Sequence, residues 1–162
     1  MPLARFIFFG DVIFMKTFIL TTLILIFSIC TVQAHDGAPV NSADIKILYG
    51  KSEIYSKADM DAAIVVVNEL FGTWQGCTMR DIRYYGDECN AQENLDWLNE
   101  LREARKLGDK KFTQCIGFLC DFYTSKDAAN HTTLEPESEY KNWQWWLART
   151  DGGEWQLMSF GY

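Results

Sequence analysis

Histidine is scarce in this chain of 162 residues, and the motifs of the common enzyme classes are absent. His35 and His131 are the only histidines, which excludes most sites that use an imidazole as general base. There is no Gly-x-Ser-x-Gly elbow, no phosphate-binding loop, no His-Glu-x-x-His motif and no dinucleotide fingerprint. The sequence therefore argues against the commonest hydrolase, nucleotide and metalloprotease mechanisms, and we expect no cofactor.

Positive charge is also in short supply. The chain has 15 Lys and Arg against 22 Asp and Glu, a net charge of −7. A chain this acidic repels phosphate backbones and anionic lipid surfaces. We therefore expect no nucleic acid and no membrane as a partner of the mature protein.

The long apolar run lies near the N-terminus and is too short to be a typical membrane span. Met15 and Lys16 precede Thr17–Cys30, "TFILTTLILIFSIC", whereas a spanning helix needs about 20 apolar residues. Small residues then stand at Val32-x-Ala34, where a signal peptidase requires them. The pattern predicts a signal peptide and hence a secreted protein. A retained anchor is the alternative.

These signals divide the chain into three parts. We interpret residues 1–34 as the signal peptide region, with Met15 as an alternative start and cleavage after Ala34. Residues 35–43 are polar and are expected to form a flexible leader. Residues 44–162 are long enough for one domain with a single core.

Four cysteines follow the predicted cleavage site: Cys77, Cys89, Cys115 and Cys120. An even number in an exported chain predicts up to two disulfides, with three possible connectivities. A zinc site is the alternative, but no pair has the Cys-x2-Cys spacing. Cys115 and Cys120 are an odd number of residues apart in a predicted strand, so they face opposite sides and should not bond to each other.

A helix is predicted for residues 57–71. Ser56 and Asp59 form the pattern of a capping box, and Gly72 ends the segment. Apolar residues recur at helical spacing on one face. That face consists of Met60, Ala63, Ile64, Val67 and Phe71.

The middle of the chain alternates between predicted strands and one further helix. Residues 77–85 favour a strand, and residues 90–108 favour a surface helix with Asn90 as its N-cap. From Lys111 the apolar period changes to two, and both faces are apolar, which predicts an interior strand. Residues 124–139 are expected to form an exposed acidic loop. The narrow apolar stripe of the second helix comprises Trp97, Leu98, Leu101 and Ala104.

A Trp-rich hairpin is predicted at the C-terminus, where "NWQWWLARTDGGEW" places four tryptophans around an Asp-Gly-Gly turn. A hairpin without a bulge gives two faces. The first holds Trp143, Trp145, Leu147, Met158, Phe160 and Tyr162, and the second holds Gln144, Trp146, Ala148, Trp155, Leu157 and Ser159. We expect the first face to pack against the helix over residues 57–71, and Trp146 and Trp155 on the second to bind a ligand or another subunit.

Four segments, "YGKSEIYSKADMDAAI", "GCTMRDIRYYGDE", "FTQCIGF" and "NWQWWLARTDGGEWQLMSFGY", together resemble a family of short exported bacterial proteins over most of Leu48–Tyr162. The predicted α+β order, an N-terminal amphipathic helix packed on a curved antiparallel sheet that ends in a Trp-rich hairpin, also resembles the NTF2-like, or cystatin-like, cone. That resemblance implies a pocket between helix and sheet and frequent homodimers. It implies no particular chemistry.

Residues with catalytic or metal-binding potential are few. Asp121, with Tyr84 or Tyr123, is the candidate for a pocket carboxylate, although Arg80 or Arg83 would equally make it a structural ion pair. Cleavage after Ala34 would give His35 a free amine, which with His131 could chelate copper.

We therefore expect a secreted, non-catalytic module that binds a small ligand or a protein partner. An NTF2-like enzyme that uses a pocket carboxylate is the alternative.

Overall fold

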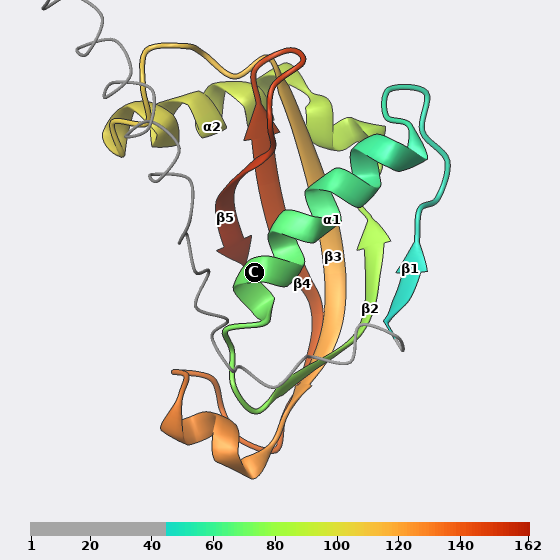
Figure 1. Cartoon of the computed structure of the whole chain (residues 1–162), viewed down its shortest axis with the longest axis vertical. Helices are drawn as coiled ribbons and strands as arrows, with labels where there is room; N and C mark the ends of the chain where they lie inside the picture. The colour runs from blue at the N-terminus through green and yellow to red at the C-terminus, as the bar shows by residue number, and fades with distance from the viewer. Residues whose placement is uncertain (1–44) are drawn as a thin grey trace, which may run out of the picture. The chain divides into compact units, whose positions relative to one another are not determined.

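The computed structural model describes residues 45–162. The predicted signal peptide, the leader and His35 lie outside the described residues. The α+β class is confirmed, with two helices and five strands (Figure 1). The elements are β1 Lys46–Leu48, α1 Lys57–Phe71, β2 Cys77–Tyr84, the 3-10 turn η2 Asp87–Asn90, α2 Gln92–Ala104, β3 Gln114–Thr124, the 3-10 turn η3 Lys126–Asn130, β4 Glu139–Arg149 and β5 Gln156–Gly161.

The strands form one open sheet in the order β1-β2-β3-β4-β5. β3 lies in the middle, as its two apolar faces predict. The expectation of a wholly antiparallel sheet was wrong at one edge, because β1 pairs with β2 in parallel. α1 makes the long connection that a parallel pair requires. β1 is only three residues long, which is too short for an alternating pattern to reveal.

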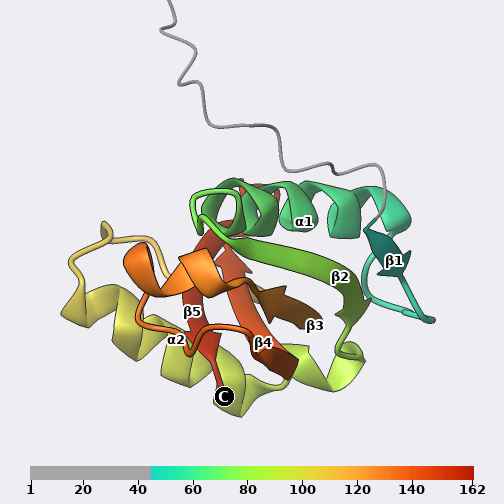
Figure 2. The ribbon, with the colours of Figure 1, turned by 90° about the horizontal axis from the view of Figure 1, so that it is seen from below.

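The two helices cover opposite faces of the sheet, as Figure 2 shows. α1 begins at the predicted Ser56, whose side chain accepts a hydrogen bond from the backbone of Asp59 in a capping box, and it ends at Gly72. All five residues of its predicted apolar face are buried. They pack on the main core, in which Trp145 is fully buried. The predicted packing of this helix on the hairpin is therefore confirmed for Trp145.

α2 lies on the surface as predicted, and its inner face closes a second, smaller core on the other side of the sheet. Leu95 and Leu98 are buried there. The apolar stripe was hard to read because its next position is Arg102, whose stem is buried and whose guanidinium binds the carbonyl of Gly108. Asn90 does not cap α2. Its side-chain oxygen accepts hydrogen bonds from the Tyr55 hydroxyl and the Cys115 amide instead.

The hairpin turns at Thr150–Gly153, where the Gly153 amide donates to the Thr150 carbonyl. The pairing of β4 with β5 shifts by one residue between Trp146 and Leu147. Such a bulge reverses which face the following residues occupy. The predicted faces were therefore wrong for three residues: Trp155 and Leu157 join the main core under α1, and Met158 joins the core under α2.

Within residues 45–162, neither helix combines the length and the apolarity needed to cross a membrane.

Candidate functional site

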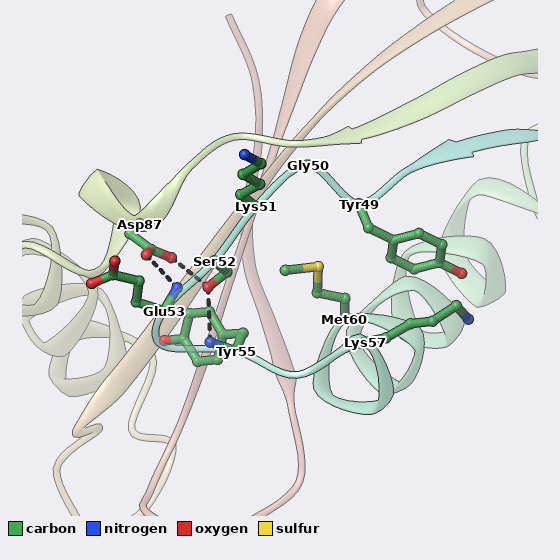
Figure 3. Close-up of a pocket in the computed structure, with 9 residues that line it drawn as sticks. All are labelled: Tyr49, Gly50, Lys51, Ser52, Glu53, Tyr55, Lys57, Met60 and Asp87. Carbon is green, nitrogen blue, oxygen red and sulfur yellow. Dashed lines mark hydrogen bonds between the residues drawn. The ribbon is translucent and has the colours of Figure 1, made fainter.

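An open cleft of about 660 Å³ lies between the loop after β1 and the start of α1 (Figure 3). The Met60 side chain reaches from α1 toward this loop. The cleft is lined by Tyr49, Gly50, Lys51, Ser52, Glu53, Tyr55, Lys57, Met60 and Asp87. It differs from the pocket that the sequence resemblance implies, because no residue of a sheet strand lines it.

Asp87 anchors the loop that forms this cleft. Its carboxylate accepts hydrogen bonds from the Ser52 hydroxyl at 2.5 Å, the Glu53 amide at 2.8 Å and the Tyr84 hydroxyl at 2.7 Å. These donors, the Ser52 hydroxyl above all, lower the pKa of Asp87. Burial raises the pKa of Tyr84. Asp87 therefore stays an ionised acceptor that holds the loop against η2.

The charged side chains at the rim of the cleft also pair with groups of the protein itself. Lys57 Nζ lies 2.8 Å from an Asp61 carboxylate oxygen and 4.4 Å from the centre of the Tyr49 ring. The Tyr49 hydroxyl donates to the same carboxylate at 2.6 Å. Because these groups already bind one another, the cleft offers little polar recognition to a ligand beyond the exposed Lys51 and Glu53.

A second surface lies at the opposite end of α1, along the outermost strand. We call it the aromatic edge. Trp74 is 6.0 Å from Trp143 and 5.5 Å from Phe160 between ring centres, and Trp143 is 5.2 Å from Tyr162. Phe160 is 46% exposed and Tyr162 77% exposed. The aromatic edge comprises Trp74, Tyr140, Trp143, Phe160 and Tyr162.

The aromatic edge contains an unsatisfied donor. The Trp143 indole nitrogen is buried and has no hydrogen-bond partner, and it is the only such buried side-chain atom in the described part of the chain. A buried donor without an acceptor costs about 1–3 kcal/mol. The other indoles of the hairpin all have acceptors: Trp145 donates to the Cys120 sulfur at 3.1 Å, Trp146 to the Gln144 side chain at 3.0 Å and Trp155 to the Asp59 carbonyl at 3.1 Å.

The strand along this surface carries no charge. β5 has the sequence QLMSFG and pairs only with β4. Edge strands are commonly protected by lysine, proline or a bulge that turns the edge away. β5 carries such a bulge at Met158, and Arg105, the C-cap of α2, binds the Met158 carbonyl at 2.6 Å. The segment from Ser159 to Gly161 has neither a charge nor a proline.

An acidic loop flanks the aromatic edge. The Tyr140 hydroxyl accepts a hydrogen bond from the Glu135 amide at 2.8 Å, which ties the loop between β3 and β4 to the aromatic residues. Glu135 and Glu137 are exposed. The loop is exposed and acidic as predicted, except that η3 forms within it and buries Ala128.

The predicted ligand-binding pair, Trp146 and Trp155, does not share a face. Trp155 is buried, 5.6 Å from the Tyr55 ring and beneath the Arg149 guanidinium at 4.2 Å. Trp146 lies on the α2 side, half-buried between Tyr85 and Trp97. A ligand-binding role for Trp146 stays a prediction.

The predicted catalytic residues are also separated. The Asp121 carboxylate accepts from Arg83 at 2.9 Å and from the Asn142 amide at 2.9 Å, and the Arg83 guanidinium lowers its pKa. This is the structural ion pair that the sequence left open. Tyr84 packs against Phe118 in the main core, on the other face of the sheet. Tyr123, two residues beyond Asp121 in β3, has no hydrogen bond to it.

His131 is exposed and lies 3.2 Å from Asp127, and no group of three or more metal-binding side chains occurs among residues 45–162.

The prediction that Cys115 and Cys120 face opposite sides is confirmed, because they belong to different cores. The structure contains no disulfide in its described part, where all four cysteines are buried thiols: Cys77, Cys89, Cys115 and Cys120.

Sequence reasoning missed Asp87, which lies 35 residues from Ser52, and it assigned Trp143 to the core alone. The Gly86-Asp87 turn signal was visible, but its long-range partners were not.

Comparison of the chain with protein-family models, with curated proteins and with solved structures finds no match.

Proposed function

We propose that this chain is an exported, non-catalytic binding module that docks a cationic protein partner through the aromatic edge. The observation that carries the proposal is the buried, unpaired indole N–H of Trp143 beside the exposed Phe160 and Tyr162. An acceptor from a partner would reach that donor only once the side chains that cover it move, and the same contact would bury the two exposed rings.

The shape of this surface favours a protein over a small ligand. A partner strand can extend the sheet by pairing with β5 beyond its bulge, over Ser159–Gly161, and its side chains can pack on the aromatic rings. Aromatic residues are enriched in protein interfaces and often dominate their binding energy. The cleft in Figure 3 supports a small ligand less well, because most of its polar groups already have partners within the protein.

The charge of the chain favours a cationic partner. The chain carries a net charge of −7, and Glu135 and Glu137 lie exposed in the loop tied to Tyr140. Opposite charge speeds association and selects partners. A second copy of this acidic chain would be repelled, so a homodimer through β5 is the less favoured occupant.

The alternative of an NTF2-like enzyme has less support. The packing of α1 on one sheet face is what that resemblance rests on, whereas the parallel β1 and the second helix layer depart from it. The carboxylate at the cleft is Asp87, whose lowered pKa suits an acceptor and not a general acid.

The test compares affinity columns that carry the wild-type chain, Phe160→Asp and the matched control Val65→Asp. Val65 is also an exposed apolar residue, 54% accessible, but lies on α1 outside the aromatic edge. We expect the wild-type and Val65→Asp columns to retain the same basic protein from an exported fraction and to release it with salt. The Phe160→Asp column should not retain it.

Two results would contradict this proposal. Retention that is equal on all three columns would place binding elsewhere. A wild-type dimer in light scattering that Phe160→Asp converts to a monomer would show that the occupant is a second copy of the chain.

A further inference from the structure

Two buried cysteines lie side by side where η2 meets β3. The Cys115 sulfur is 2.9 Å from the carbonyl oxygen of Cys89, and the Cys89 sulfur is 3.7 Å from the carbonyl oxygen of Cys115. Both side chains are fully buried. The contact is reciprocal, so each thiol already lies against the residue to which a disulfide would join it.

Gly117 permits this close approach. A side chain at Gly117 would place its first carbon 3.3 Å from the Cβ of Cys89. Cys115 stands two residues earlier in β3 and therefore presents its side chain to the same face as that missing carbon. Cys89 thus packs directly on the part of β3 that carries Cys115.

The other two cysteines are placed away from this pair. Cys77 pairs across the sheet with Thr124, nine residues along β3 from Cys115, a separation of roughly 30 Å. Cys120 lies on the face of β3 opposite Cys115 and three residues beyond Gly117, against which Cys89 packs, and it accepts the indole hydrogen bond of Trp145. About four residues, or roughly 13 Å of strand, separate it from the position opposite Cys77.

We propose that Cys89 and Cys115 form the one disulfide of the exported protein, and that Cys77 and Cys120 stay as thiols. The proposal rests on export to an oxidising compartment, where such bonds persist, and not on the proposed partner. It selects one connection from those that the cysteine count leaves open.

The bond forms by thiol–disulfide exchange with a disulfide oxidant such as oxidised glutathione. One cysteine thiolate attacks the oxidant, forms a mixed disulfide and releases one glutathione thiolate. The second cysteine thiolate then displaces the other glutathione. The two cysteines lose two electrons and two protons in total, and the oxidant is reduced to two thiols.

The order of events follows from burial. Burial raises the pKa of Cys89 to about 11 and that of Cys115 to about 12, so the folded thiols supply little of the reactive thiolate. Oxidation is therefore expected while the chain folds, or when η2 opens locally. Once formed, the bond would hold η2, and with it Asp87, against β3.

The decisive experiment maps the disulfide in the full chain. The chain is refolded with oxidised and reduced glutathione, its free thiols are blocked in denaturant without reductant, and it is digested with trypsin and chymotrypsin. Trypsin releases Cys89 between Arg83 and Arg102, and chymotrypsin at Phe118 separates Cys115 from Cys120. We expect Cys89 linked to Cys115, with Cys77 and Cys120 blocked. Four blocked cysteines, or a link that involves Cys77 or Cys120, would overturn the proposal.

A second measurement tests the bond through stability. The bond closes a loop between residues 26 apart, so reductant should lower the Tm of the wild type by roughly 10 °C. Cys77→Ser, a matched buried control, should show the same drop, and Cys89→Ser should show none. A wild type that is insensitive to reductant would contradict the proposal. Should Cys89→Ser fail to fold, the peptide map of the wild type still decides.

Discussion

Trp145 and Trp143 stand two residues apart on β4 and face the same side of the sheet, yet they belong to two different regions. Trp145 is fully buried beneath α1 and donates to the Cys120 sulfur. Trp143 lies at the aromatic edge, where its N–H has no acceptor and its neighbours Phe160 and Tyr162 are exposed. The indole donor is thus buried and paired in one region, and buried but unpaired in the other. The difference shows that aromatic content alone does not separate core from surface, and the proposed binding surface rests on the unpaired donor beside exposed rings.

The largest loss of stability is expected in the core beneath α1 around Trp145, which we call the closed region; the aromatic edge around Trp143 is the open region. Trp145→Ala should lower the free energy of unfolding by about 3–5 kcal/mol, because it removes a fully buried indole and leaves a cavity. Urea unfolding followed by circular dichroism measures the loss. Trp97→Ala is the control, because Trp97 is 37% exposed and should cost clearly less. Equal losses at both positions would contradict the placement of Trp145 at the centre of the core.

A smaller loss is expected where Trp155 meets α1. Trp155→Phe should cost about 1–2 kcal/mol, because the Asp59 carbonyl loses its donor and the ring contact with Tyr55 shrinks. The same unfolding experiment measures it. A neutral result would mean that this end of the α1 layer is as loosely built as the aromatic edge.

Acid should weaken the closed region through Asp59. Hydrogen bonds from Ser56, and then from Arg149, lower the pKa of this carboxyl below its value in the unfolded chain. Its contribution is therefore present above the unfolded pKa of about 3.8 and is lost as the pH falls through the lower folded pKa. Asp59→Asn should cost about 1 kcal/mol at pH 7 through its weakened hydrogen bonds, and it should flatten the decline of the unfolding free energy toward pH 3. If the unfolding free energies of the wild type and Asp59→Asn fall in parallel as the pH is lowered, this role of Asp59 is ruled out.

The smallest effect is expected at the open region, and its sign is the informative part. Trp143→Phe removes an unpaired donor, so the unfolding free energy should change by less than about 0.5 kcal/mol or should rise. Trp145→Phe, the matched change, should be destabilising because it deletes a hydrogen bond that exists. Equal destabilisation at both positions would mean that Trp143 has an acceptor in solution.

The parts of the fold that were predicted correctly depend on local patterns. Ser56 with Asp59 marks the start of α1 within four residues of sequence, and the alternation in β3 predicts an interior strand. The failures arise where one residue changes the pattern. Arg102 occupies a buried position of α2, and the bulge after Trp146 exchanges the faces of β5.

The candidate sites were less predictable because they depend on long-range contacts. Asp87 meets Ser52 and Glu53 across at least 34 residues of sequence. The aromatic edge joins Trp74, which follows α1, to Phe160 in the last strand. Periodicity in the sequence does not predict such long-range contacts. The sequence does show that the residues of β5 carry no charge.

The most direct test of the central claim is the indole N–H signal of Trp143 in a ¹H–¹⁵N spectrum, recorded before and after addition of the basic protein that the wild-type column retains. We expect the Trp143 signal to shift downfield and to become protected from hydrogen exchange, because it gains an acceptor, while the signals of Trp145 and Trp155 stay in place. An unchanged Trp143 signal in a saturated complex, or a response confined to Trp146, would contradict binding at the aromatic edge.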